Sequence, residues 1–156
     1  SKRISYNRMT AIVYTDASHD SDRKIAACGH CILYGNRNKL IKHQVLLYEN
    51  IHTPTNAECI AIVNGIQDAF MLKGVKVIVV NTDCKGISVA LRSAKKGHKQ
   101  LKKYDAFNEL KETIIVCEEN GIEVFVNHIK GHNGHKYNTM IDTSCRTNLR
   151  KHLKTI

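Results

Sequence analysis

The sequence contains a single proline among its 156 residues, only nine glycines and no tryptophan. So little proline and glycine, with 42% hydrophobic residues, argues against a disordered or low-complexity chain. No apolar stretch approaches the roughly 18 residues that span a bilayer, and none follows the basic N-terminus. We therefore expect neither a membrane helix nor a secretory signal. At this length we expect one domain over 1–156, with residues 1–8 as a flexible basic extension.

Acidic residues are few in comparison with basic ones. The chain carries 24 Lys and Arg residues against 14 Asp and Glu residues, which gives a formal net charge of +10. On a compact domain this excess predicts a polyanionic partner, and nucleic acid is the first to consider. No linker, repeat or low-complexity segment divides the chain, so the charge belongs to the domain as a whole.

Six cysteines occupy positions that we expect to lie in strands and helices of the core: Cys28, Cys31, Cys59, Cys84, Cys117 and Cys145. A chain of this length builds a core without disulfides, so we expect reduced thiols in an intracellular compartment: the cytoplasm, or the virion or host cell of a virus. The alternative is a zinc site made by Cys28, Cys31 and the histidines at 128, 132 and 135. No second C-x-x-C exists, and residues 28 and 31 of a strand point to opposite faces, so structural zinc is not expected.

Apolar periodicity predicts an α/β domain. Alternating and continuous apolar segments predict strands at 10–16, 25–34, 39–48, 75–83 and 122–129, with a polar turn at 18–24. A helical stripe from Cys59 to Phe70 predicts a helix over 55–72, and further helical patterns cover about 85–94, 101–120 and the segment after 136. The order βββαβααβα implies a five-stranded mixed sheet flanked by helices, with three antiparallel strands followed by two parallel strands.

Two aspartates, Asp16 and Asp83, end the two most hydrophobic predicted strands, and each follows a threonine. Ligand sites in such sheets gather at the carboxyl ends of the strands, so neighbouring parallel strands would place these carboxylates side by side. Two poorly solvated like charges persist only with a cation or a shared proton between them. The alternative is that each aspartate merely starts a turn or caps a helix.

Two further acids, Glu58 and Asp142, adjoin the apolar stripes of predicted helices. Glu58 lies one turn before Ile62, from where its carboxylate can reach toward the strand ends; the alternative is a capping box, Thr55 to Glu58. Asp142 neighbours Ile141, and its alternative role is that of a first-turn acid favoured by the helix dipole. Four carboxylates without a basic partner favour hard divalent cations, and on a basic domain they suggest phosphodiester cleavage.

Three segments that contain these acids are similar to motifs of one known family. Tyr14-Thr-Asp-Ala-Ser18 is similar to a first-strand pattern, T-D-[GA]-S. Thr55-Asn-Ala-Glu-Cys-Ile-Ala-Ile62 is similar to a helix pattern, T-N-x-x-E-L-x-A-I. Val80-Asn-Thr-Asp-Cys-Lys85 is similar to the S/T-D-S segment that ends a fourth strand. Each motif is weak alone, but they occur in order on matching elements.

A fourth segment is the most specific. Ile129-Lys-Gly-His-Asn-Gly-His135, followed by Asn138 and Asp142, resembles V-K-G-H-x-G-H-x-x-N-x-x-x-D almost position for position. With the other three motifs it makes the chain, from about residue 11 to 153, similar to a type 1 ribonuclease H domain of the RNase H-like/retroviral integrase superfamily. The resemblance implies an RNase H-like fold.

The resemblance also implies an activity. Asp16, Glu58, Asp83 and Asp142 would hold two Mg²⁺ ions, which Mn²⁺ can replace. The enzyme would cut the RNA strand of an RNA–DNA hybrid and leave 5′-phosphate and 3′-hydroxyl ends. His132 matches a mobile-loop histidine that assists proton transfer or product departure.

Substrate contacts are implied at further positions. Asn56 matches a minor-groove contact, although its spacing from Glu58 is shorter than usual, and Lys85 stands where many members have Gln. Asn138, for which a helix N-cap is the alternative, and Ser18 complete the smaller contacts. A basic segment without Trp stands where some members have a DNA-binding handle; its alternative is a solvated helix face, and its lysines are Lys95, Lys96, Lys99, Lys102 and Lys103.

Two other functions remain open on the sequence. One is a module that binds hybrids or double-stranded RNA without cutting, against which the complete set of four acids argues. The other is a DNA-cleaving resolvase or integrase core, against which the G-H-x-G-H loop argues. We expect a monomer without a membrane partner, and a polymerase or reverse transcriptase as neighbour if the domain is cut from a longer chain.

Overall fold

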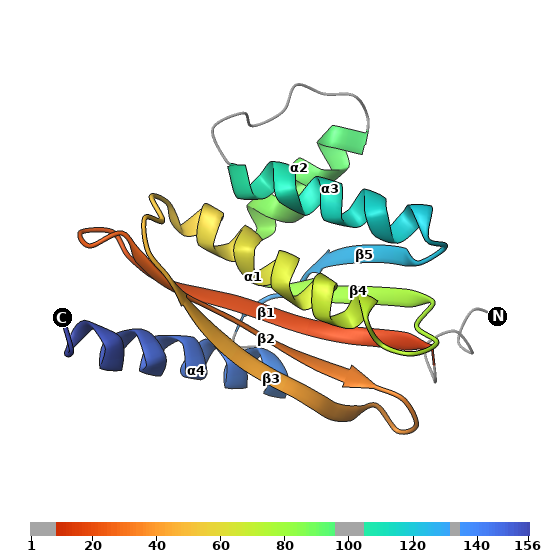
Figure 1. The fold of residues 1–156 in the computed structure, drawn as a ribbon, viewed down its shortest axis with the longest axis horizontal. Helices are drawn as coiled ribbons and strands as arrows, with labels where there is room; N and C mark the ends of the chain where they lie inside the picture. The colour runs from red at the N-terminus through yellow and green to blue at the C-terminus, as the bar shows by residue number, and fades with distance from the viewer. Residues whose placement is uncertain (1–8, 96–104, 132–134) are drawn as a thin grey trace.

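The computed structural model describes residues 9–95, 105–131 and 135–156, and it shows a five-stranded sheet with helices on both faces (Figure 1). The strands lie in the order β3-β2-β1-β4-β5. The pairs β1–β2 and β2–β3 are antiparallel, and β4 is parallel to both β1 and β5. The elements are β1 (Thr10–Asp20), β2 (Ile25–Tyr34), β3 (Lys39–Tyr48), α1 (Pro54–Phe70), β4 (Val77–Thr82), α2 (Lys85–Lys95), α3 (Asp105–Glu119), β5 (Glu123–His128) and α4 (Lys136–Leu153). The predicted order βββαβααβα and the mixed sheet are confirmed, and the extension expected at 1–8 lies outside the described residues.

The first strand is longer than its apolar pattern predicts. We expected β1 to end at Asp16 and a turn to cover 18–24, but β1 continues to Asp20. Ser18, His19 and Asp20 pair with the first residues of β2 across an antiparallel ladder. The prediction failed because polar residues can pair through their backbone as well as apolar ones, so that the turn shrinks to 21–24.

The start of α1 also differs from the prediction. The N-cap is Thr53, whose side-chain oxygen accepts a hydrogen bond from the Asn56 backbone N–H at 3.1 Å. Pro54 follows at the first helical position, where its fixed φ suits the helix and its missing N–H costs nothing. Thr55 is therefore not the cap, and the capping box considered as the alternative role of Glu58 is wrong.

Two helices cover opposite faces of the central strands. Cys28 of β2 packs against α1 residues Ala57 and Ala61, whereas Cys31 packs against Ile141 of α4. The prediction that residues 28 and 31 face opposite sides of the sheet is confirmed, and all six cysteines are free. Figure 1 shows α1, α2 and α3 on one side of the sheet and α4 on the other. Helices therefore cover both faces of β1 and β2.

Two glycines let these helices approach the sheet closely. A Cβ atom at Gly29 of β2 would lie 2.6 Å from the sulfur of Cys145 on α4. A Cβ atom at Gly65 of α1 would lie 2.7 Å from Val13 of β1. Neither contact tolerates a side chain, so Gly65 sets how near α1 comes to β1 and Gly29 sets how near α4 comes to β2.

In the described residues, no helix combines the length and apolar character that a membrane crossing needs.

Candidate active site

The parallel pairing of β1 and β4 brings Asp16 and Asp83 to one edge of the sheet. Thr15 pairs with Thr82, so the next residue along each strand is an aspartate. Asp16 is 4% exposed. After Thr82 the chain leaves the sheet, and the Thr82 hydroxyl accepts a hydrogen bond from the Cys84 backbone N–H at 3.1 Å, which fixes the turn that carries Asp83. The predicted neighbourhood of these two acids is confirmed.

Glu58 reaches the same edge from α1. Its Oε1 accepts a hydrogen bond from the Ala17 backbone N–H at 3.1 Å. The same N–H donates to Asp16 Oδ1 at 2.9 Å, so one backbone donor is shared by the two carboxylates. Because Thr53 already caps the helix, Glu58 is free of the capping role and turns toward the sheet.

Asp16, Glu58 and Asp83 form a compact cluster, in which one oxygen from each residue lies within 4.8 Å of the others. Burial and the charge of Asp83 raise the pKa of Asp16 from 3.8 to about 7. Burial and the charge of Asp16 raise the pKa of Glu58 well above its ordinary value. The cluster therefore resists carrying three negative charges unless a cation or protons compensate them.

The donor set of this cluster fits a divalent metal. Glu58 Oε2 is buried, and no hydrogen-bond donor reaches it from the described residues. A buried carboxylate oxygen without a partner is costly, and a cation removes that cost. All three ligands are carboxylates, which suit Mg²⁺ or Mn²⁺ better than softer metals. The cluster contains neither cysteine nor histidine.

Asp142 adjoins the cluster from α4. Its side chain interacts with that of Asp16 and contributes to the raised pKa there. Asp142 lies outside the group of three, and its Oδ2 forms an ion pair with Arg146 Nη2 at 2.9 Å. Since α4 begins at Lys136, Asp142 is in the second turn, and the first-turn role considered for it is wrong.

A family comparison bears on this arrangement. The family model described as RNase H matches residues 8–150, nearly the whole chain. The chain belongs to the RNase H family. No curated protein matches it. The five-stranded mixed sheet is accordingly that of an RNase H-like fold, and the three-carboxylate cluster lies in the segments whose motifs predicted it.

Two buried thiols hydrogen-bond to the backbone at or next to the RNase H carboxylates. The Cys145 thiol donates to the Asp16 carbonyl oxygen at 3.4 Å, and the Cys28 thiol donates to the Ala57 carbonyl oxygen, next to Glu58, at 3.3 Å. Burial raises the pKa of Cys28 to about 12, so its thiol stays protonated and able to donate. Neither role was predicted, because a buried cysteine that donates to a backbone carbonyl has the same sequence pattern as one that only fills the core.

Asn138 and Gly131 lie on the Asp83 side of the cluster. Asn138 is 1% exposed, and its Oδ1 has no hydrogen-bond donor in the described part of the chain. The N-cap of α4 is His135, so the N-cap role considered for Asn138 is wrong. A Cβ atom at Gly131 would lie 3.2 Å from Asp83 Oδ2 and 3.9 Å from Asn138 Nδ2. Glycine at 131 lets this loop approach Asp83 closely.

The predicted substrate residues are distributed unevenly around the cluster. Asn56 Oδ1 accepts a hydrogen bond from the Ala106 backbone N–H at 3.2 Å, so its carboxamide joins α1 to α3. Lys85 is exposed at the first turn of α2, two residues after Asp83, and Ser18 is half-buried within β1. Lys95 is the last residue of α2. The other predicted residues lie outside the described residues: Lys96, Lys99, Lys102, Lys103 and His132.

Proposed function

We propose that this RNase H domain is an endoribonuclease that hydrolyses the RNA strand of RNA–DNA hybrids, leaving 5′-phosphate and 3′-hydroxyl ends. The observation that carries the proposal is the cluster of Asp16, Glu58 and Asp83 where the parallel pairing of β1 and β4 ends, within a domain of this family. The net charge of +10 supports a polyanionic substrate.

Asp16, Glu58, Asp83 and Asp142 would hold two Mg²⁺ ions, for which Mn²⁺ can substitute. When bound, such ions lower the pKa of water and stabilise the charge on the leaving oxygen of a phosphodiester. The fit rests on the raised pKa of Asp16 and Glu58 and on the unpartnered Glu58 Oε2, all of which a divalent cation would relieve.

The chain's own residues would orient the site. The Ala17 N–H holds the carboxylates of Asp16 and Glu58 in a fixed relation. Burial keeps bulk water from screening them, which strengthens their interaction with a bound cation. His132, in its glycine-flanked loop, would take or give a proton as product leaves. A histidine suits this because its ordinary pKa lies near neutrality.

Substrate contacts would surround the cluster. Exposed Lys85 lies close enough in sequence to Asp83 to meet the strand that is cut. Ser18 would contact the hybrid near the cut. Asn138 is 1% exposed and would do so only if the residues that cover it move, and Asn56 would do so only if its bond to Ala106 opens. The lysines from Lys95 to Lys103 would follow the backbone of the DNA strand. The free thiols agree with a reducing, intracellular location, in which we propose that the domain acts as a monomer or beside a polymerase.

A substrate panel tests the proposal. The protein is incubated in Mg²⁺ with an RNA–DNA hybrid labelled on the RNA, duplex RNA, duplex DNA and a four-way DNA junction. We expect cleavage of the hybrid RNA alone, 5′-phosphate ends on the products, and loss of cleavage with a chelator. Hybrid binding without cleavage would support a non-catalytic module instead, and preferential cutting of the junction would support a DNA-cleaving superfamily member.

A further inference from the structure

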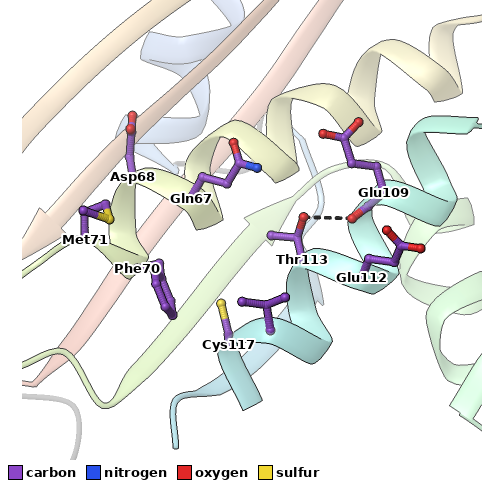
Figure 2. Close-up of a pocket in the computed structure, with 9 residues that line it drawn as sticks. Gln67, Asp68, Phe70, Met71, Glu109, Glu112, Thr113 and Cys117 are labelled. Atoms are coloured by element: carbon purple, nitrogen blue, oxygen red, sulfur yellow. Dashed lines mark hydrogen bonds between the residues drawn. The ribbon is translucent and has the colours of Figure 1, made fainter. Parts of the chain in front are cut away.

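A groove of about 530 Å³ runs between the C-terminal turns of α1 and the middle of α3. Figure 2 shows Phe70 and Met71 on its α1 side and Glu109, Glu112 and Thr113 on its α3 side. The groove does not belong to the carboxylate cluster. Glu58 and Phe70 are twelve residues apart on α1, which is about 18 Å along a helix.

The lining of the groove contains exposed apolar side chains. Met71 is 79% exposed and Val116 is 48% exposed, and Phe70 is half-buried between them and the core. Apolar side chains that gather at one exposed groove indicate a contact with another molecule.

The charge of this face is opposite to that of the rest of the chain. Among the described residues, three acids and no lysine or arginine line the groove, in a chain of net charge +10: Asp68, Glu109 and Glu112. Glu109 and Glu112 line the groove and are exposed. Among the described residues neither of them forms a salt bridge. The third lining acid, Asp68, already pairs with His30 and Lys42. Exposed acids that no described cation pairs, on a basic protein, indicate that Glu109 and Glu112 can accept a cation of a partner.

These features exclude two kinds of occupant. The phosphates of a nucleic acid would be repelled by Glu109 and Glu112. A second copy placed symmetrically would bring two acidic faces together, and the repulsion between like charges disfavours that arrangement.

We propose that the groove binds a basic amphipathic helix of a partner protein. Apolar side chains of that helix would pack on Phe70, Met71 and Val116, and its Lys or Arg residues would pair with the two glutamates.

The proposal places the partner away from the nucleic acid. The groove lies toward the amino end of β4, because Met71 and Leu72 lead into the loop before that strand, whereas Asp83 follows its carboxyl end. A partner helix in the groove can therefore stay bound while the carboxylate cluster holds substrate. The interaction does not depend on the activity proposed above.

A peptide titration tests this surface. The probe is a synthetic helix of about five turns made of Leu and Lys at helical spacing, added to the ¹⁵N-labelled full chain. The comparison peptides are a scrambled isomer of the same charge and a Leu/Glu peptide of the same pattern. We expect saturable shifts of Phe70, Met71 and Val116 resonances with the patterned basic peptide. Equal shifts with the scrambled peptide, or shifts confined to residues around Asp16, would overturn the proposal.

Matched charge variants locate the contact. The double variant Glu109→Lys, Glu112→Lys should weaken peptide binding at least about tenfold, because it places like charges against the peptide. The control is Glu118→Lys, Glu119→Lys, which makes the same charge change on exposed residues of the same helix outside the groove. The control should bind within about twofold of wild type. An equal loss of peptide affinity in both variants would mean that only the net charge of the protein matters, and it would contradict specific binding in the groove.

Discussion

Asp142 and Arg146, one turn apart on α4, form an ion pair with an N–O distance of 2.9 Å beside the carboxylate cluster. The guanidinium of Arg146 occupies one oxygen of the acid that is expected to complete a metal-binding set of four. A cation that recruits Asp142 must therefore compete with Arg146. The pair is partly solvated, with the Arg146 side chain 55% exposed and that of Asp142 21% exposed, so the competition is weak but measurable.

Replacing Arg146 should strengthen divalent-metal binding. In the variant Arg146→Met we expect the Mg²⁺ affinity of the site that includes Asp142 to rise about two- to fivefold. This factor corresponds to the free energy of an exposed ion pair. Isothermal titration of the protein with MgCl₂ measures this directly. Arg150→Met removes an exposed arginine one turn further along α4 and should leave the affinity unchanged. Unchanged affinity in Arg146→Met would mean that Asp142 does not take part in metal binding.

The raised pKa of Asp16 makes the metal-free protein sensitive to pH. A carboxyl group whose folded pKa is about 7, against 3.8 ordinarily, binds its proton more tightly in the folded state. Its contribution to stability is therefore complete below about pH 4 and is lost as the pH rises toward 7. The loss is of the order of 2–4 kcal/mol.

The variant Asp16→Asn isolates this contribution. Without metal we expect the free energy of unfolding of Asp16→Asn, relative to that of wild type, to increase from pH 4.5 to pH 7, because the amide cannot ionise. Urea unfolding in the presence of a chelator at both pH values gives the difference. Mg²⁺ at pH 7 should then stabilise wild type more than the variant. A difference that is constant across this pH range would show that Asp16 is not forced toward its protonated form.

The contact of Gly29 with Cys145 predicts a steric substitution effect. Gly29→Ala would put a methyl group 2.6 Å from the Cys145 sulfur and should cost about 1–3 kcal/mol. Cys145→Ala removes that sulfur, so the double variant should recover part of the loss beyond additivity. Thermal unfolding of both single variants and the double variant completes the cycle. Strict additivity would mean that the strain lies elsewhere, for example against Ile141 at 3.2 Å.

Much of the fold followed from the sequence because apolar periodicity and burial coincide in the central elements. The bounds of β2 and β3 were predicted to the residue. The ends of β1 and α1 were not, since backbone pairing extends β1 through polar residues and Thr53 with Pro54 outcompetes Thr55 as helix start. Local patterns cannot rank such competing starts without tertiary contacts.

The sequence predicted which acids of the site lie together, but it did not predict the contacts that surround them. Asp16 and Asp83 each follow a threonine of the pair Thr15–Thr82, which joins the parallel strands β1 and β4, and that register brings them together. The pairing of Asp142 with Arg146 could not be distinguished in advance from any other i, i+4 pair on a helix surface. Likewise, the thiol of Cys145 gave no signal that it would donate to Asp16 rather than fill the core.

The central claim is that the carboxylate cluster cleaves RNA in hybrids, and single-turnover hydrolysis by Asp83→Asn tests it most directly. The control is Asp22→Asn, the same change in an exposed turn. With saturating hybrid and Mg²⁺ we expect Asp83→Asn to lose at least about 10³-fold in rate while it folds and still binds the hybrid, and Asp22→Asn to stay within about twofold. Near wild-type hydrolysis by folded Asp83→Asn would contradict the assignment of this cluster as the active site.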